Sequence, residues 1–244
     1  EVKFYFMEIP FRISIFEEYC RAEEATAQQI LEQVKQKRNS VIGLATGRTM
    51  RGVYRFLIDE EKKEPGLFKD VTFVQLDEII LKTVGEGIFS KELRELFIER
   101  LEGGYEAFLS INVFVEDMVK EAAEYLKKVL NAGGIDLQLL GIGVNGHIGY
   151  NEPGSERQSS CRVVSLAPTT IERDGLPIGS MGITLGVEDI LNSKKIVLIA
   201  TGNSKASAVR QALKSTPSVE SPASFLVNHK CISIILDNQA ASML

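Results

Sequence analysis

The sequence predicts an α/β protein with a doubly wound, mostly parallel sheet and helices on both faces. Short apolar runs of strand length alternate with amphipathic helical stretches along the 244 residues. Glycine-containing turns join several of the strands to the helices that follow, as in parallel sheets with right-handed crossovers. The chain shows no linker and no internal repeat, so we expect residues 1–244 to form a single domain.

Apolar runs bounded by turn residues predict the strands. They are expected at residues 11–16, 40–44, 71–76, 137–140, 163–166, 195–200 and 231–236. Residues 1–10 alternate in polarity, which indicates a short edge strand or an extended lead-in. The glycine-rich stretch after residue 140 lies where ligands bind in open α/β sheets, at the carboxyl end of a buried strand.

The helices are predicted from apolar residues that recur every three or four positions. In residues 17–37 Ala, Glu, Gln and Lys dominate around an apolar stripe, which is typical of an amphipathic helix. Further helices are expected around residues 49–57 and at 91–101, 113–129, 187–191, 206–213 and 222–227. Residues 84–89 predict a loop, and residues 168–182, rich in Pro, Gly and charge, predict a mobile flap.

Composition argues against several classes of partner. The net charge of −5 and the lack of a long basic run speak against nucleic acid. The three cysteines are widely spaced and no Cys/His cluster is present, so we expect no structural metal site, and Cys231 is expected to be buried. The sequence shows no signal peptide or membrane span, which favours a cytoplasmic protein without a membrane partner.

The turn after residues 137–140 carries one of the two histidines. His147 stands among glycines that include Gly143, with Asn145 before it and Glu152 five residues after it. A neutral imidazole beside a carboxylate can move protons near neutral pH. The alternative is a glycine-rich connection whose histidine only satisfies backbone groups. The other histidine, His229, is expected to be structural, at a helix end or on the surface.

Two further turns favour an anion. Thr46, Gly47, Arg48 and Thr49 lie between a predicted strand and a helix, where backbone N–H groups and the helix dipole attract negative charge. Lys205 follows the same kind of turn after residues 195–200, so that one phosphate could lie between the two. The alternative is an ordinary helix N-cap at a threonine.

A pair of acids lies at the exit of the predicted strand at residues 71–76. Asp77 and Glu78 could act as a charge pair at a helix N-terminus, as a metal site or as a catalytic base. A metal site is the weakest of the three, because no cluster of oxygen ligands lies near them in the sequence.

Taken together, several segments resemble the glucosamine-6-phosphate deaminase/isomerase family. LATGRT, VQLDE, GIGVNGHIGYNEPG, ITLGVEDIL and LIATGNSKASAV follow one another in the order seen in that family, across residues 40–236. The resemblance implies a modified Rossmann-like fold. The related 6-phosphogluconolactonases share a Gly-His turn but do not continue into NEP. An Asn before GH, ITLGVEDILN and PASFL make the chain look closest to galactosamine-6-phosphate isomerases.

The resemblance implies a role for each matching residue. Asp77 matches the base that moves a proton between C2 and C1 of the open sugar. His147 matches the catalyst of ring opening, with Glu152 as its acidic partner. Asn145 stands where glucosamine-type enzymes carry Asp; its amide can still orient the imidazole through a hydrogen bond. The phosphate and substrate site is implied at Thr46, Gly47, Arg48, Thr49, Gly143 and Lys205. The family's lid supplies an arginine to the phosphate, for which Arg173 is the candidate.

The implied reaction is deamination of galactosamine 6-phosphate to tagatose 6-phosphate and ammonia. The alternative substrate is glucosamine 6-phosphate, which would give fructose 6-phosphate. The resemblance implies no cofactor and no metal, because proton transfer and hydrolysis account for each step. Whether the chain forms a homo-oligomer stays open. Two other interpretations remain, a 6-phosphogluconolactonase and a non-catalytic sugar-phosphate sensor.

Overall fold

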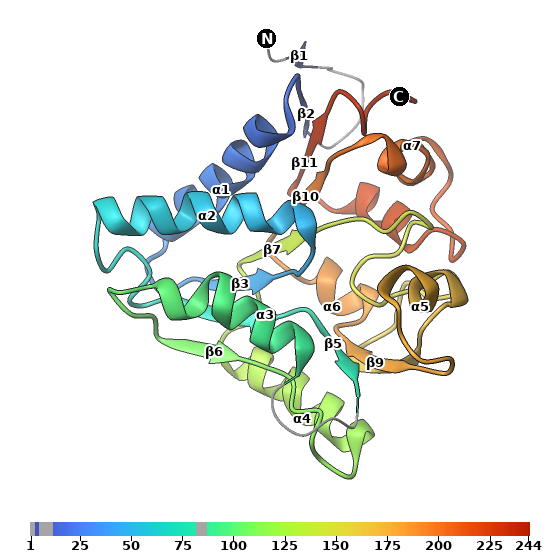
Figure 1. Cartoon of the computed structure of the whole chain (residues 1–244), viewed down its shortest axis with the longest axis horizontal. Coiled ribbons are helices and arrows are strands. Elements are labelled where there is room, and N and C mark those ends of the chain that lie inside the picture. Colours follow the sequence, from blue (N-terminus) through green and yellow to red (C-terminus); the bar gives the residue numbers. More distant parts are fainter. Residues whose placement is uncertain (1–2, 5–11, 82–86) are drawn as a thin grey trace.

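The computed structural model describes residues 3–4, 12–81 and 87–244 (Figure 1). Among these residues an eight-stranded sheet has the order β1-β2-β11-β10-β7-β3-β4-β6. Its strands are β1 (Lys3–Phe4), β2 (Arg12–Phe16), β3 (Val41–Leu44), β4 (Thr72–Gln75), β6 (Ala107–Leu109), β7 (Leu137–Leu140), β10 (Lys195–Ala200) and β11 (Ile232–Asp237). Every neighbouring pair is parallel except β1 with β2. The predicted mostly parallel α/β fold is confirmed.

Helices lie on both sides of this sheet (Figure 1). They are α1 (Tyr19–Gln36), α2 (Arg48–Lys63), α3 (Ile88–Leu96), α4 (Met118–Asn131), α5 (Pro168–Asp174), α6 (Val187–Leu191) and α7 (Ala206–Lys214). Short 3-10 turns form η1 (Ile98–Arg100), η2 (Asn203–Lys205) and η3 (Pro222–Asn228). In the described part of the chain, none of the helices is long and apolar enough to cross a membrane.

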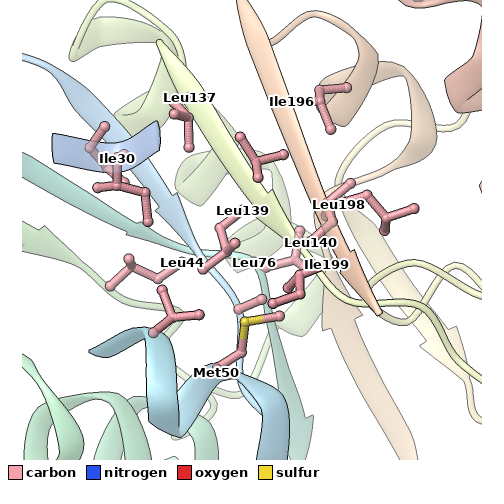
Figure 2. Close-up of a cluster of buried hydrophobic side chains, with 14 of the residues drawn as sticks. Ile30, Leu44, Met50, Leu76, Leu137, Leu139, Leu140, Ile196, Leu198 and Ile199 are labelled. Carbon is pink, nitrogen blue, oxygen red and sulfur yellow. The ribbon is translucent and has the colours of Figure 1, made fainter. Parts of the chain in front are cut away.

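The central strands are buried along their whole length. Every residue of β3 and β7, and all but the first of β10, is buried, as expected for parallel strands covered on both faces. Figure 2 shows Leu44, Leu139 and Ile199 of these three strands converging near Met50 of α2. This core fixes the carboxyl ends of β3, β7 and β10 side by side, and the turns that follow them meet at one edge of the sheet.

A second sheet was not predicted. It is antiparallel, has the order β5-β9-β8, and consists of β5 (Asp77–Ile80), β9 (Met181–Thr184) and β8 (Arg162–Ser165). Asp77 and Glu78 lie at the exit of β4, as predicted, but they also begin β5, which was not expected. Only Leu76 separates β4 from β5, and no turn residue marks the boundary, so composition does not show that the chain changes sheets between them.

The predicted flap at residues 168–182 contains regular structure. Its first part is α5, which begins with Pro168 in the first turn and ends at Gly175 in the left-handed conformation, φ 63°. Its last two residues already belong to β9. Pro and Gly therefore mark the ends of a short helix here, whereas the composition alone indicated a loop.

Two other helix boundaries differ from prediction. α4 begins at Met118 rather than near residue 113, because the side chain of Asp117 accepts a hydrogen bond from Lys120 N, 2.9 Å, and caps the helix. Strand β6 precedes it and was missed. The helix predicted at 91–101 begins earlier, at Ile88, and gives way to η1. Residues 84–86 of the predicted loop, and most of residues 1–10, lie outside the described residues, whereas the last two residues of that loop belong to α3.

The prediction that Cys231 is buried was wrong, whereas His229 lies at a helix end as expected. Cys231 is exposed, because it precedes β11 instead of lying inside it. His229 follows the end of η3, as expected for a helix-end histidine, but it is buried. Its Nε2 lies 2.8 Å from Ser193 O, and its Nδ1 accepts a hydrogen bond from Cys231 N. These local contacts agree with a structural role.

Candidate active site

The predicted site residues meet in one cleft of about 1080 Å³ at the carboxyl ends of β3, β7 and β10. Its walls include Thr46, Gly47, Arg48, Thr49, Asp77, Gly143, His147 and Lys205. Asn145 and Glu152 join the cleft through hydrogen bonds to His147. Residues far apart in the sequence are therefore brought together as the sequence predicts.

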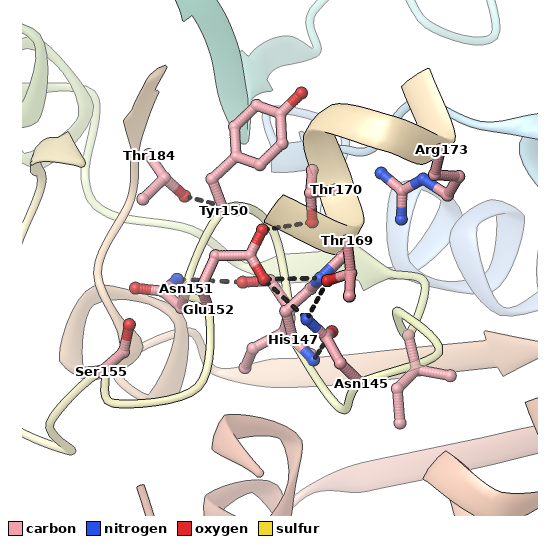
Figure 3. Close-up of polar contacts among 12 residues, drawn as sticks. Asn145, His147, Tyr150, Asn151, Glu152, Ser155, Thr169, Thr170, Arg173 and Thr184 are labelled. Carbon is pink, nitrogen blue, oxygen red and sulfur yellow. Dashed lines mark hydrogen bonds and ion pairs between the residues drawn. The ribbon is translucent and has the colours of Figure 1, made fainter. Parts of the chain in front are cut away.

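The turn after β7 holds His147 against Glu152. His147 Nδ1 lies 3.1 Å from Glu152 Oε2, and both side chains are buried (Figure 3). A hydrogen bond from Gly143 N to His147 O, 2.9 Å, closes the turn. A Cβ on Gly143 would lie 2.4 Å from the His147 ring, so only glycine leaves room for the imidazole. The Glu152 carboxylate favours a proton on Nδ1, which leaves Nε2 as the nitrogen free for substrate.

Asn145 supports Glu152 rather than the imidazole ring. Its Nδ2 donates to Glu152 Oε2, 2.9 Å, and its Oδ1 accepts from the backbone N of His147, 3.2 Å. The expected orientation of the imidazole by Asn145 is thus indirect, through the carboxylate and the backbone. On the other side, Thr170 of α5 donates to Glu152 Oε1. The sequence contains no local sign of Thr170, because this contact requires α5 to fold over the turn.

Glu152 carries its charge over a wide pH range. Burial raises the pKa of this carboxyl, but hydrogen bonds from His147, Thr170 and Asn145, with the charge of His147, outweigh burial and lower the pKa to about 2. An ionised Glu152 keeps the imidazole in one orientation and stabilises it when it gains a proton. The pair can therefore take up and return a proton during a reaction.

Asp77 has the opposite electrostatic setting. Burial first, and then the charge of Glu78, raise the pKa of Asp77 to about 8; Asp174 adds to the rise and Arg173 opposes it. The side chain is only 7% exposed but borders the cleft. A carboxyl group whose pKa lies near neutral pH can both accept a proton from carbon and give it back.

The two glycine turns beside β7 face the same cleft. Gly47 precedes α2 with φ 119°, and Gly202 precedes η2 with φ 86°, both in the left-handed region that favours glycine. Thr49 Oγ1 and Thr201 Oγ1 lie 3.0 Å apart and join the two turns. Because β3 and β10 flank β7, this arrangement places two helix starts around one space, where their backbone N–H groups favour negative charge.

Lys205 and Arg173 add positive charge to this space. Lys205 Nζ donates to Ile142 O, 2.7 Å, which holds the ammonium at the end of β7. Burial lowers the pKa of Lys205 to about 8, and the charges of Arg173 and Arg48 contribute. Arg173 lies on the cleft wall, and its guanidinium pairs with the neighbouring Asp174 at 2.6 Å. A bound anion would relieve the repulsion among these three cations.

No metal centre is evident within the described ranges, where no group of three or more His, Cys, Asp and Glu side chains is placed to hold an ion. The cleft instead combines a histidine–carboxylate pair, a buried acid and a cationic end. This set of groups is suited to proton transfer on a small anionic molecule.

Comparison with known proteins identifies the family. The sequence profile described as glucosamine-6-phosphate isomerases/6-phosphogluconolactonase matches residues 17–235. The chain belongs to this family. The matched range includes the β3, β5, β7 and β10 segments that build the cleft.

Individual relatives agree with this assignment. The chain is 34% identical over 240 residues to glucosamine-6-phosphate deaminase of Thermoanaerobacter sp. (strain X514), covering 96% of this chain and 95% of the relative. It is 34% identical over 232 residues to glucosamine-6-phosphate deaminase 1 of Bacillus subtilis (strain 168), covering 92% and 96%.

Solved structures show the same architecture. A structure described as a monomeric glucosamine-6-phosphate deaminase superposes with a TM-score of 0.88 at 32% identity, covering 95% of this chain and 99% of that one. The 6-phosphogluconolactonase of Trypanosoma brucei superposes with a TM-score of 0.77 at 19% identity over 95% and 98% of the two chains. The second likeness bears on the fold alone.

Proposed function

We propose that this protein converts glucosamine 6-phosphate and water to fructose 6-phosphate and ammonia. The chain is an amino-sugar-phosphate deaminase/isomerase, and its relatives described above are named glucosamine-6-phosphate deaminases. The proposal is carried by the arrangement of one cleft. Asp77 and the His147–Glu152 pair border the same space as Lys205 and the Thr46–Thr49 turn.

The first step assigned to the site is opening of the sugar ring. The O1 hydroxyl loses its proton, the C1–O5 bond breaks, and O5 takes up a proton. His147 Nε2 can carry this proton between the two oxygens, because Glu152 holds Nδ1 and compensates the positive charge of the imidazolium. The open-chain aldehyde then has an acidic proton on C2, next to the amino group.

The second step moves that proton from C2 to C1. Asp77 removes it as a general base, the C1 oxygen takes up a proton from the C2 ammonium group of the substrate, and a neutral enolamine forms. Asp77 then returns the C2 proton to C1, which leaves a protonated ketimine at C2. Water adds to the ketimine carbon and the C2–N bond breaks. Ammonia and fructose 6-phosphate are then released as separate products. The pKa of Asp77, raised to about 8 by burial first and then by Glu78, suits both directions of transfer.

The phosphate would act as the handle that orients the sugar. The helix starts after Gly47 and Gly202 and the ammonium of Lys205 supply donors at one end of the cleft. Binding energy from a remote group of this kind holds the reacting carbons near the catalytic groups.

Replacing Lys205 with Ala is expected to raise the KM for glucosamine 6-phosphate by about 10-fold or more, because a hydrogen bond between charged groups is lost. The change in kcat should be smaller, since Lys205 would bind phosphate and not the reacting carbons. Lys127→Ala on the exposed face of α4 is the matched control and should leave KM unchanged. An unaltered KM in Lys205→Ala would remove this residue from the phosphate site.

The pH dependence of kcat/KM is expected to be bell-shaped with its maximum near pH 8. Asp77 must lose its proton to act as a base, so activity falls as pH drops below its pKa of about 8. Lys205 must keep its proton to attract phosphate, so activity falls again as pH rises above its pKa of about 8. Initial rates at low substrate concentration measure the profile. A flat profile across neutral and alkaline pH would contradict these assignments.

Galactosamine 6-phosphate is the second candidate substrate. ITLGVEDILN, PASFL and the Asn before GH favour it, whereas the names of the relatives favour glucosamine. Ammonia release from the two sugar phosphates, measured side by side, separates them. We expect a higher kcat/KM for glucosamine 6-phosphate; a higher value for the galactose epimer would return the chain to the galactosamine branch.

The same assay addresses the two other interpretations. Release of ammonia from neither sugar, together with hydrolysis of 6-phosphogluconolactone, would support a lactonase. Tight binding of sugar phosphate without any turnover would support a sensor. The raised pKa of Asp77, caused first by burial, argues against a sensor, because a site that only binds does not require a proton acceptor.

A further inference from the structure

A second buried carboxylate, Glu78, adjoins Asp77 and has no part in the steps above. Its side chain is completely buried and accepts four hydrogen bonds. Oε1 accepts from the backbone N of Ile79 and of Phe89, both at 2.9 Å. Oε2 accepts from Ser90 N and from Gln75 Nε2, both at 2.8 Å. One side chain thus ties β5 to the first turn of α3 and to the end of β4.

The same network holds the backbone of Asp77. Gln75 Nε2 also donates to Asp77 O, 2.8 Å, while Gln75 Oε1 accepts from Ile111 N, 2.9 Å. Gln75 is itself buried, so its amide has no water to turn toward. Glu78 and Gln75 together fix the point at which the chain leaves the main sheet and enters β5, and Asp77 lies at that point.

The surroundings of Glu78 direct hydrogen-bond donors at both oxygens of its carboxyl group. All four of its described partners are N–H donors, and a proton on either oxygen would face one of them. Two of the donors belong to the first turn of α3, where the helix dipole stabilises negative charge. A Cβ on Gly87 would lie 2.3 Å from Glu78 Oε2, so the glycine before α3 is needed for this approach.

We propose that Glu78 is a positioning residue for Asp77: its fixed carboxylate anchors β5 and keeps a permanent negative charge beside the base. The proposal rests on the proposed function, in which Asp77 takes the C2 proton. Glu78 needs no contact with substrate for this role. Its charge disfavours a second negative charge on Asp77, so Asp77 holds its proton more tightly and becomes a stronger base.

Some of the other groups around Asp77 raise its pKa and others lower it. Asp174 of α5 adds to the effect of Glu78, and Arg173 opposes it. The buried phenols that also interact with Asp77 are Tyr150, in the turn after β7, and Tyr125 of α4. Both phenols have a raised pKa, chiefly because of burial, and carry no charge near neutral pH. Glu78 is therefore the nearest fixed negative charge along the chain, and the one held by the most hydrogen bonds.

The test compares the acid limb of the kcat/KM profile in three variants. Glu78→Gln keeps the size of the side chain and removes its charge, so the acid limb should move about one unit to lower pH. Glu78→Asp keeps the charge but shortens the reach to α3, so kcat should fall while the acid limb stays near its wild-type position. Glu61→Gln is the matched control, because Glu61 is another buried carboxylate that accepts two backbone hydrogen bonds, from Gly66 and Gly103.

A carbon-13 NMR titration of the Asp77 carboxyl gives the same comparison without turnover. The signal is assigned by its loss in Asp77→Asn. A lower Asp77 pKa in Glu78→Gln, and an unchanged one in Glu61→Gln, would support the proposal. The proposal is overturned if Asp77 has the same pKa in folded Glu78→Gln as in the wild type. It is also overturned if Glu78→Asp lowers the Asp77 pKa as much as Glu78→Gln does. Because the titration needs no substrate, a wild-type protein that releases no ammonia would count against the proposed function alone.

Discussion

The Asp77→Asn variant is expected to release ammonia at least about 10³-fold more slowly than the wild type. Asparagine has nearly the same shape as the acid, but its amide cannot accept the proton from C2. Substrate binding should change little, because the phosphate end of the cleft lies at Lys205 and the Thr46–Thr49 turn. Steady-state ammonia release, combined with calorimetric binding of glucosamine 6-phosphate, measures both effects. Activity within a factor of about ten of wild type would exclude Asp77 as the base.

The same substitution should make the protein more stable at alkaline pH. Burial first, and then Glu78, raise the pKa of Asp77 from 3.8 to about 8 in the folded state. Between these values the folded protein binds a proton that the unfolded chain releases, so stability falls as pH rises. Asparagine does not ionise and removes this loss. Above pH 8 the melting temperature of Asp77→Asn should exceed that of wild type by at least about 2 °C.

The His147→Gln variant is expected to lower kcat by about 10²-fold, because glutamine cannot carry the proton needed for ring opening. Glu152→Gln should have a smaller effect in the same direction, since the imidazole stays in place but loses the carboxylate partner of Nδ1, 3.1 Å away. Ammonia release from the cyclic sugar phosphate measures both. If His147→Gln kept more than about a tenth of wild-type activity, ring opening would not depend on His147.

Much of the site follows from the sequence because it lies on consecutive strand–turn units. The apolar run before Gly141 predicts β7, and the glycines after it predict a turn at its carboxyl end. The strand order seen in the structure places β3 and β10 on either side of β7, which brings Thr46, His147 and Lys205 together. The local patterns predict the turns, and the common direction of parallel strands places these turns at one edge of the sheet.

The rest of the site depends on contacts between distant segments. Asp77 pairs with Thr184 across the second sheet, and Thr170 reaches Glu152 only after α5 has packed over the turn. The change of sheet cannot be read from the residues near Asp77, because only Leu76 separates β4 from β5 and no turn residue marks the boundary. The pairing of Glu78 with α3 likewise follows from the fold and not from the composition of either segment.

Asn145 illustrates a role that the sequence predicts only in outline. The amide was expected to orient the imidazole, and its side chain does lie in the same hydrogen-bond network. The structure shows that it bonds to Glu152 and to the His147 backbone. An amide at this position therefore keeps the carboxylate in place without adding charge. This agrees with the low pKa of Glu152, because burial raises that pKa but the hydrogen bonds from His147, Thr170 and Asn145 lower it further than burial raises it.

The most direct test of the account is the joint measurement of ammonia and fructose 6-phosphate formed from glucosamine 6-phosphate near pH 8, for wild type and Asp77→Asn. The account predicts that the wild type forms both products in equal amounts and that Asp77→Asn forms neither at a comparable rate. Equal rates for the two proteins, or a wild type that binds the sugar phosphate without releasing ammonia, would contradict it.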